Sequence, residues 1–166
     1  MRLILNAWRD YLVEGEQKIY SFDFDSTLIR YRSDPDDPPN VVYDGPHEEN
    51  IQLAKQLAAQ GNKIIIVTSR MEPQGPKKWW DDSPLPEDII SDHELPIEEV
   101  YYTNGNLKAD KLLELGVSKH WDDDEEEIAA AEEAGIEAVL VPSEEGLTEA
   151  LRNKWINHLA AEAKQN

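Results

Sequence analysis

Short apolar runs alternate with helix-like segments along most of this chain. Strands are expected near residues 18–25, 63–67, 100–103, 117–121 and 137–141. Helices are expected near 46–60, 107–115 and 125–134, each followed by a glycine, and from about 143 into the 160s. This alternation predicts an α/β fold: a three-layer, Rossmann-like parallel sheet of about five strands with helices on both faces. The run Ile-Ile-Ile-Val at 64–67 is typical of a strand buried on both faces.

Three segments fall outside this pattern. Residues 29–45, rich in Pro and Asp, are expected to form a loop. Residues 71–97 contain five prolines, which exclude a long helix, although a short one fits over 87–94. Residues 1–17 have apolar side chains at helical spacing and predict a short amphipathic helix ahead of a single domain over 18–166.

Composition narrows the class of protein. The chain has 166 residues, of which 40% are apolar, so it can bury a core and is not a disordered chain. No apolar run of about 18 residues occurs, so no membrane-spanning helix is expected. The absence of cysteine excludes thiolate metal sites and a cysteine nucleophile, and fits a cytoplasmic location. A formal charge of −19 disfavours binding to a nucleic-acid backbone and favours binding of cations.

The residues that can carry chemistry gather at the predicted carboxyl ends of the strands. In a parallel sheet these ends share one edge, where ligands bind. Two carboxylates at alternate positions of a buried strand need a cation or a proton between them, and a third acidic group completes an oxygen site of the Mg²⁺ kind. The four histidines show no ligand spacing and are assigned no chemistry. The strand ends carry Asp23, Asp25, Ser26 and Thr27, then Thr68, Ser69 and Arg70, then Lys108, and finally Asp122, Asp123 and Asp124.

The first two strand ends resemble motifs of the haloacid dehalogenase (HAD) superfamily of phosphohydrolases. Its first motif, Asp-x-Asp-x-Thr after an apolar strand, is matched by residues 23–27. Its second motif, an apolar strand that ends in Thr or Ser, is matched by residues 64–68. The acid at position 25 favours the phosphatases of the superfamily over its dehalogenases, which lack an acid there.

The third and fourth motifs complete the resemblance, which covers about residues 18–142. The third motif is a lysine, matched by Lys108, with Lys111 one turn later as the alternative. The fourth is an acidic pair in a helix that ends in Ala-Gly, and Asp123 with Glu127 gives the best match. Asp122 and Asp124 are alternatives to Asp123, because the three aspartates are consecutive.

The resemblance implies an Mg²⁺-dependent phosphatase that forms an aspartyl-phosphate. It implies that Asp23 is the nucleophile and a metal ligand, and that Asp25 is the general acid/base and lends its backbone carbonyl to the metal. Asp123 completes the metal shell. Thr68 holds a phosphoryl oxygen, Lys108 bridges nucleophile and phosphate, and Ser26, Thr27, Ser69 and Arg70 are candidate substrate-binding residues. Arg70 has an equal alternative, which is to pair with one of the nearby acids.

No segment is long enough for an inserted cap domain, so a minimally capped, open site is expected. The expected substrate is a small phosphorylated molecule such as a nucleotide. Two other functions stay open. The run Thr68-Ser69-Arg70 resembles the Ser/Thr-Gly-Arg of polynucleotide 3′-phosphatases, with Ser69 in place of the glycine and a net charge that disfavours the polymer. The chain could instead be a catalytically idle HAD-like protein whose N-terminal segment docks a partner.

Overall fold

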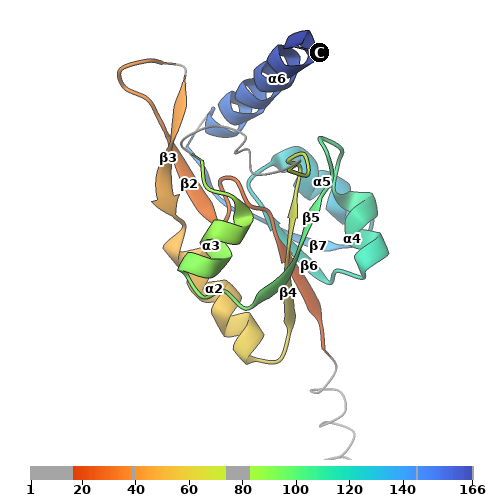
Figure 1. Ribbon diagram of the computed structural model, residues 1–166. Coiled ribbons are helices and arrows are strands. Elements are labelled where there is room, and N and C mark those ends of the chain that lie inside the picture. Colours follow the sequence, from red (N-terminus) through yellow and green to blue (C-terminus); the bar gives the residue numbers. More distant parts are fainter. Residues whose placement is uncertain (1–16, 39, 74–82, 145, 166) are drawn as a thin grey trace, which may run out of the picture.

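A computed structural model describes residues 17–165, except Pro39, residues 74–82 and Glu145. The expected N-terminal helix therefore lies outside the described residues. Five strands form one parallel sheet in the order β5-β4-β1-β6-β7 (Figure 1). The strands of this sheet are β1 (Ile19–Phe22), β4 (Lys63–Thr68), β5 (Ile97–Tyr102), β6 (Lys119–Asp122) and β7 (Glu137–Leu140). The predicted α/β class and all five predicted strands are confirmed.

Helices cover both faces of the sheet, as predicted, and each face has its own core. The flanking helices are α2 (Glu48–Ala59), α3 (Pro86–Asp92), α4 (Ala109–Leu115) and α5 (Glu125–Glu133). Because side chains alternate along a strand, Ile64 and Ile66 of β4 join the core that contains residues of α2 and α3. Ile65 and Val67 join the core that contains residues of α4 and α5. The isoleucine-rich run is therefore buried on both faces.

The expected loop over 29–45 is wrong, because most of this segment forms an antiparallel hairpin. Its strands are β2 (Ile29–Ser33) and β3 (Val41–Pro46). Ile29 and Tyr31 are buried whereas Arg30 and Arg32 are exposed, which is the alternation of a half-buried strand. The described Pro and Asp residues between the two strands form only the turn, which is closed by a hydrogen bond from the Asp34 N–H to the Asn40 carbonyl at 2.8 Å.

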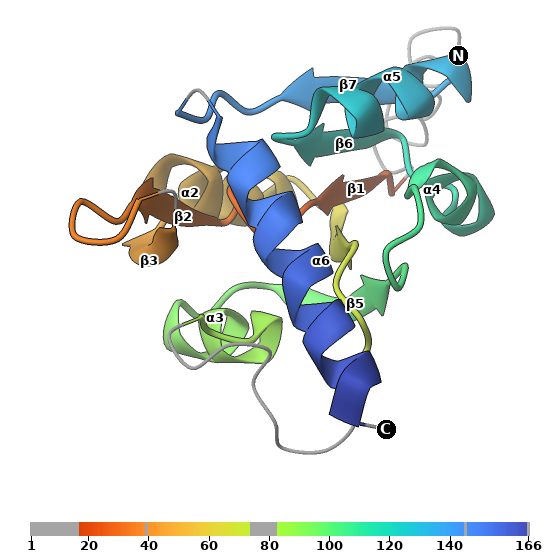
Figure 2. The same ribbon diagram turned by 90° about the horizontal axis from the view of Figure 1, so that it is seen from above.

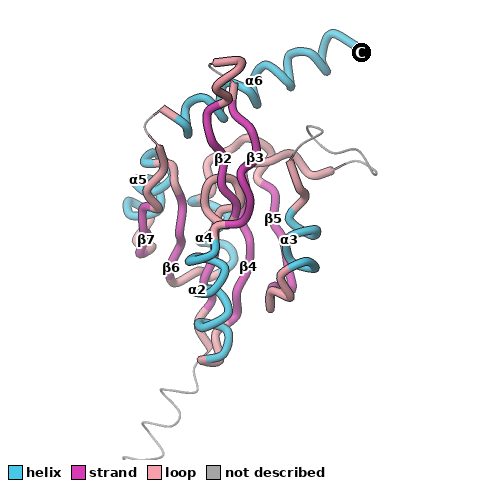
Figure 3. Tube along the Cα trace, turned by 90° about the vertical axis from the view of Figure 1, so that its left-hand side faces the viewer, coloured by secondary structure: helices cyan, strands magenta, loops and turns pink. Residues whose placement is uncertain are grey.

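The last helix, α6 (Leu147–Gln165), crosses the carboxyl edge of the sheet (Figures 1 and 2). Leu147 and Leu151 are buried in the core shared with α2, and the Lys154 ammonium donates to the Val41 carbonyl of β3 at 3.1 Å. Figure 3 shows the β2–β3 hairpin rising toward α6 at the same edge. The edge that carries the predicted site is therefore covered from above by the chain's own C-terminal helix.

None of the helices in the described part of the chain combines the length and the apolar character needed to cross a membrane.

Candidate active site

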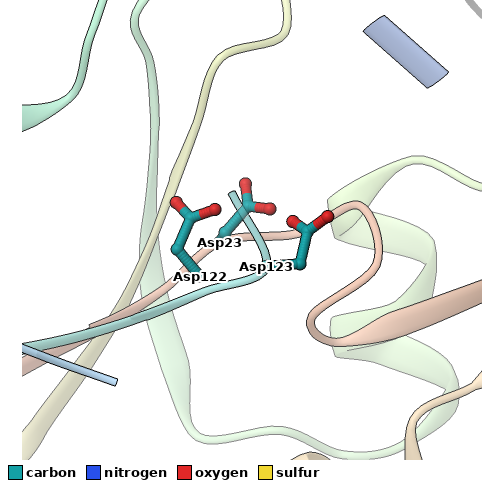
Figure 4. A group of neighbouring side chains, drawn as sticks. All are labelled: Asp23, Asp122 and Asp123. Atoms are coloured by element: carbon teal, nitrogen blue, oxygen red, sulfur yellow. The ribbon is translucent and has the colours of Figure 1, made fainter. Parts of the chain in front are cut away.

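Three aspartates meet at the carboxyl edge of the sheet, where β1 and β6 lie side by side. Asp23 follows β1, and its N–H extends the strand pairing by donating to the Trp121 carbonyl at 2.8 Å. Asp122 ends β6 and Asp123 follows it. One carboxylate oxygen of each lies within 4.8 Å of the others, and all three residues are buried (Figure 4). This oxygen donor set fits a hard cation such as Mg²⁺.

Burial and mutual repulsion make this cluster costly without a cation. Burial, reinforced by the charge of Asp122, raises the pKa of Asp23 well above its usual value. The same two causes raise the pKa of Asp123 to about 7. The charge of Lys108 does not compensate these two carboxylates fully, so they also need a bound proton or a metal ion.

Lys108 lies against the acidic cluster at the start of α4. Its ammonium is 2.8 Å from Asp23 Oδ1 and 2.5 Å from Asp122 Oδ2, and the residue is buried. Burial alone would lower the pKa of Lys108, but the charges of Asp122 and Asp23 raise it well above its usual value. The alternative, Lys111, is instead paired with Glu114 at 3.2 Å on the outside of α4. The structure thus brings Lys108, and not Lys111, to Asp23.

Asp122 and Asp123 have different surroundings. Asp122 Oδ2 accepts from Lys108 and, at 2.9 Å, from His120 Nε2, while Oδ1 accepts the Asp124 N–H at 3.0 Å. Burial alone would raise the pKa of Asp122, but Lys108 and His120 lower it. Asp123 accepts instead from the Thr148 hydroxyl of α6, at 2.6 Å. Because Asp122 is already bound to cationic and N–H donors, Asp23 and Asp123 are the better pair to hold a metal ion.

His120, to which the sequence assigned no chemistry, fixes Asp122 from inside the sheet. Its Nδ1 is 2.7 Å from the Ser21 hydroxyl, and its Nε2 faces the Asp122 carboxylate. Since a carboxylate can only accept, Nε2 carries the proton and Nδ1 accepts from Ser21. Burial lowers the pKa of His120, which favours this neutral form. Nothing in the local sequence marks the histidine, because its partners are brought to it by strand pairing.

Asp25 lies beside the cluster and is held by Arg70. The guanidinium donates from Nε to Oδ2 at 2.8 Å and from Nη2 to Oδ1 at 2.7 Å, and the Tyr31 hydroxyl adds a hydrogen bond of 2.6 Å to Oδ1. Burial alone would raise the pKa of Asp25, but Arg70 outweighs it and keeps the pKa below its usual value. Of the two sequence-based alternatives for Arg70, the structure shows pairing with an acid.

The hydroxyl residues predicted for the site differ in how close they lie to the acidic cluster. Ser69 lines the cavity above the acidic cluster. The Thr27 hydroxyl is 3.4 Å from Asp23 Oδ2, and the buried Thr68 hydroxyl accepts the Arg70 N–H at 3.3 Å. Ser26, in a positive-φ turn (φ 61°), lines a different and smaller hollow beside the β2–β3 hairpin. Of these predicted residues only Ser69 lines the cavity that contains Asp23. The described lining does not include Ser26, Thr27, Thr68 or Arg70.

The acidic cluster opens into a cavity of about 490 Å³, large enough for a small ligand. Its floor includes the aspartates and Lys108, and one wall is the first turn of α5. Four side chains of α6, which the sequence did not indicate, complete the lining: Thr148, Leu151, Arg152 and Ile156. No sequence pattern could reveal them, because α6 reaches the site from the far end of the chain.

Comparison with known proteins gives distant similarities of fold. No protein-family model matches the sequence, and no curated protein matches it. A hypothetical protein from Xanthomonas campestris is 21% identical, with a TM-score of 0.43 over 75% of this chain and 65% of its own. A Vibrio cholerae protein assigned as a 3-deoxy-D-manno-octulosonate 8-phosphate phosphatase is 17% identical, with a TM-score of 0.43 over 73% and 64%.

A third solved structure is the N-terminal part of a Bacteroides fragilis protein, which contains a phosphatase domain and was solved with Mg. It is 17% identical, with a TM-score of 0.46 over 90% of this chain and 40% of its own. The chain spans less than two thirds of the length of each of these three proteins.

Proposed function

We propose that the protein is an Mg²⁺-dependent phosphomonoester hydrolase of the HAD type, with Asp23 as the nucleophile. The observation that carries the proposal is the contact of Lys108 with both Asp23 and Asp122, beside Asp123, at the floor of an accessible cavity. A carboxylate flanked by a buried lysine and by a cluster that needs a cation can receive the negatively charged phosphoryl group. The HAD-like order of the motifs along the sequence agrees with this assignment.

In the first step, an Asp23 oxygen attacks the phosphorus atom and the bond from phosphorus to the ester oxygen breaks. The products are an aspartyl-phosphate and an alcohol, whose oxygen takes a proton from Asp25. Arg70 favours the ionised form of Asp25, so this proton has to be supplied. A monoester that enters as its monoanion carries one, because the second pKa of such a phosphate is about 6.

In the second step, a water molecule attacks the phosphorus atom of the aspartyl-phosphate. The ionised Asp25 accepts one proton from this water, and the bond between phosphorus and the Asp23 oxygen breaks. Asp25 passes this proton to the departing phosphate or to solvent and is ionised again, inorganic phosphate leaves, and the Asp23 carboxylate is restored. The ion pair with Arg70 suits Asp25 to this second role, because it keeps the carboxylate ionised and directed by two hydrogen bonds.

Asp23, Asp123 and the backbone carbonyl of Asp25 would hold the Mg²⁺ ion. Bound there, the ion would neutralise negative charge on the phosphoryl oxygens. Lys108 supplies a second positive charge beside the nucleophile, where Asp122 fixes its ammonium group. The HAD-like motif assigns a phosphoryl oxygen to Thr68, whose hydroxyl is buried and outside the cavity lining. Ser69 is the hydroxyl residue of this strand end that lines the cavity.

The test is phosphate release from small phosphate esters, measured with Mg²⁺ and with EDTA. We expect turnover only with Mg²⁺. Acid quenching during turnover, followed by peptide mass spectrometry, should find a phosphoryl group on Asp23. A catalytically idle interaction protein would release no phosphate from a panel of phosphometabolites. Turnover without any modification of Asp23 would instead indicate direct attack by water and would overturn the aspartyl-phosphate.

A further inference from the structure

The cavity above the acidic floor has an apolar mouth. Leu107, in the loop before α4, and Ile156, on α6, are each 56% exposed, although large apolar side chains are usually covered. Among the described residues only four large apolar side chains are exposed, and these two line the same cavity. The buried Leu151 of α6 adds a third apolar side chain to the lining.

The first two turns of α6 fix this mouth relative to the acidic floor. The Thr148 hydroxyl donates to Asp123 Oδ2 at 2.6 Å, and Arg152 Nη2 donates to Asp124 Oδ2 at 2.5 Å. Leu151, between them, is buried in the core. Ile156 stands one helical turn beyond Arg152, so the same helix that contacts the proposed metal ligand also carries the apolar rim across the sheet edge (Figure 2).

Charge at the mouth disfavours a second anionic group on the ligand. Among the described residues of the lining, the only cations are Lys108 and Arg152. Lys108 is bound to Asp23 and Asp122 at the floor. Arg152 is bound to Asp124 and lies 3.8 Å from Glu126, so the rim offers an additional anion no uncompensated positive charge.

From this juxtaposition we infer that Leu107, Leu151 and Ile156 form a leaving-group subsite for phosphomonoesters of uncharged, apolar alcohols. The inference rests on the proposed phosphatase function, which places the phosphoryl group at the floor and the alcohol toward the mouth. The apolar part of the alcohol then covers the exposed faces of Leu107 and Ile156 and excludes water from the reacting atoms. The C-terminal helix thus takes the place of an inserted cap.

The first experiment measures binding without chemistry. Titration calorimetry with Mg²⁺ compares benzylphosphonate with methylphosphonate, which share the phosphonate group and differ in the apolar part. We expect the wild-type protein to bind benzylphosphonate about tenfold more tightly, as burial of part of a ring predicts. Leu107→Ser and Ile156→Ser should each weaken benzylphosphonate binding about three- to tenfold and leave methylphosphonate binding unchanged.

Leu113→Ser is the matched control, because Leu113 is 53% exposed on α4 and is not among the residues that line the cavity. It should leave both affinities unchanged. Equal affinity of the wild-type protein for the two phosphonates would overturn the subsite. The same loss in Leu113→Ser as in Leu107→Ser would also overturn it, and so would equal weakening of both ligands by the rim variants.

The second experiment compares kcat/KM for benzyl phosphate and glycerol phosphate, both of which release an alcohol rather than a phenol. We expect benzyl phosphate to be the better substrate, and Ile156→Ser to remove most of its advantage. Equal hydrolysis of the two esters would leave the phosphatase proposal standing and overturn the subsite. No hydrolysis of either ester, with benzylphosphonate binding still dependent on Leu107 and Ile156, would overturn the phosphatase proposal and support an apolar ligand site.

Discussion

Arg70 binds both carboxylate oxygens of Asp25 from a position that is only 1% exposed to solvent. The guanidinium also donates to the Ser83 hydroxyl at 2.8 Å, and the Tyr31 hydroxyl contacts both Asp25 and Ser83. Asp25 follows β1, Arg70 follows β4, Tyr31 lies in the β2–β3 hairpin and Ser83 precedes α3. The proposed acid/base is therefore held by a buried polar network that joins four parts of the chain.

Removal of the Arg70 charge should destabilise the fold strongly. Arg70→Met leaves the Asp25 carboxylate largely buried and without its cation, which costs about 3–5 kcal/mol in the free energy of unfolding. The double variant Arg70→Met/Asp25→Asn should recover part of this loss, because it removes the uncompensated charge. Urea unfolding in EDTA measures both. Arg32→Met, which breaks an exposed ion pair with Asp44 at 3.6 Å, is the control and should cost less than about 1 kcal/mol.

If Arg70→Met were no more destabilising than Arg32→Met, the Arg70–Asp25 pair would not be a structural element of the native state. Its role would then be confined to the reaction, as a contact that forms only in part of the catalytic cycle.

Much of the fold follows from periodicity along the chain. The isoleucine run at 63–67 and the alternation around Phe22 predict central strands, and glycines mark the ends of three helices. The hairpin at 29–46 was missed because its alternation of Ile29 and Tyr31 with arginines is only a few residues long. The Pro- and Asp-rich turn beside it carries the stronger local signal, and that signal is for a loop.

The residues of the candidate site also fall into a predictable and an unpredictable group. Asp23, Lys108 and Asp123 were predictable, because they follow strands whose carboxyl ends must meet at one edge of a parallel sheet. The partners that decide their environments were not. His120 reaches Asp122 through strand pairing, Tyr31 reaches Asp25 from the missed hairpin, and α6 lines the cavity from 25 or more residues further along the chain. Such contacts have no periodicity that a single sequence reveals.

Asp23→Asn should abolish turnover and leave the fold intact. The amide is close in size to the carboxylate but is a poor nucleophile, so we expect kcat to fall by about a thousandfold or more. Burial raises the pKa of Asp23, so the variant also removes a costly buried charge, and its melting temperature in EDTA should not fall. Glu133→Gln, an acid-to-amide change at an exposed position of α5 that does not line the cavity, is the control for turnover. Phosphate release by folded Asp23→Asn at the wild-type rate would exclude Asp23 as the nucleophile.

Mg²⁺ should raise the melting temperature of the wild-type protein, because it binds the native acidic cluster and not the unfolded chain. Asp123→Asn should reduce this shift, since it removes one of the two carboxylates best placed to hold the ion. Ca²⁺ should also raise the melting temperature but support little turnover, because its looser coordination misplaces the nucleophile. Thermal unfolding in EDTA, Mg²⁺ and Ca²⁺ tests this. An equal Mg²⁺ shift in wild type and in Asp123→Asn would remove Asp123 from the metal site.

Without metal, stability should fall as the pH rises toward neutrality. The pKa of Asp123 is raised from its ordinary value of 3.8 to about 7, and the pKa of Asp23 is raised as well. The folded protein therefore holds protons that the unfolded chain has released, so the stabilisation is complete below the ordinary value and is lost as the pH passes about 7. Melting temperatures in EDTA should decline across this range, and Asp123→Asn should flatten the decline.

Mg²⁺ should reverse that dependence, because it binds only the ionised carboxylates and so competes with protons. The Mg²⁺-induced shift in melting temperature should grow between about pH 5.5 and pH 7.5, as the ligands lose their protons. A shift of constant size across this range would show that the carboxylates of Asp23 and Asp123 are already ionised in the metal-free protein.

Small phosphate esters should be better substrates than phosphorylated nucleic-acid ends. The chain carries a formal charge of −19, and the cations in the described lining of the cavity, Lys108 and Arg152, are both bound to carboxylates. A polyanion therefore meets repulsion along its backbone, whereas a small ester reaches the floor with a single phosphate. We expect a higher kcat/KM for a mononucleotide than for a 3′- or 5′-phosphorylated oligonucleotide, and only a modest change of the mononucleotide rate with salt.

The measurement compares kcat/KM for the mononucleotide and for the oligonucleotide at low and moderate salt. A clear preference for the oligonucleotide that collapses as salt is added would reveal backbone contacts and make a polynucleotide-end phosphatase the better assignment.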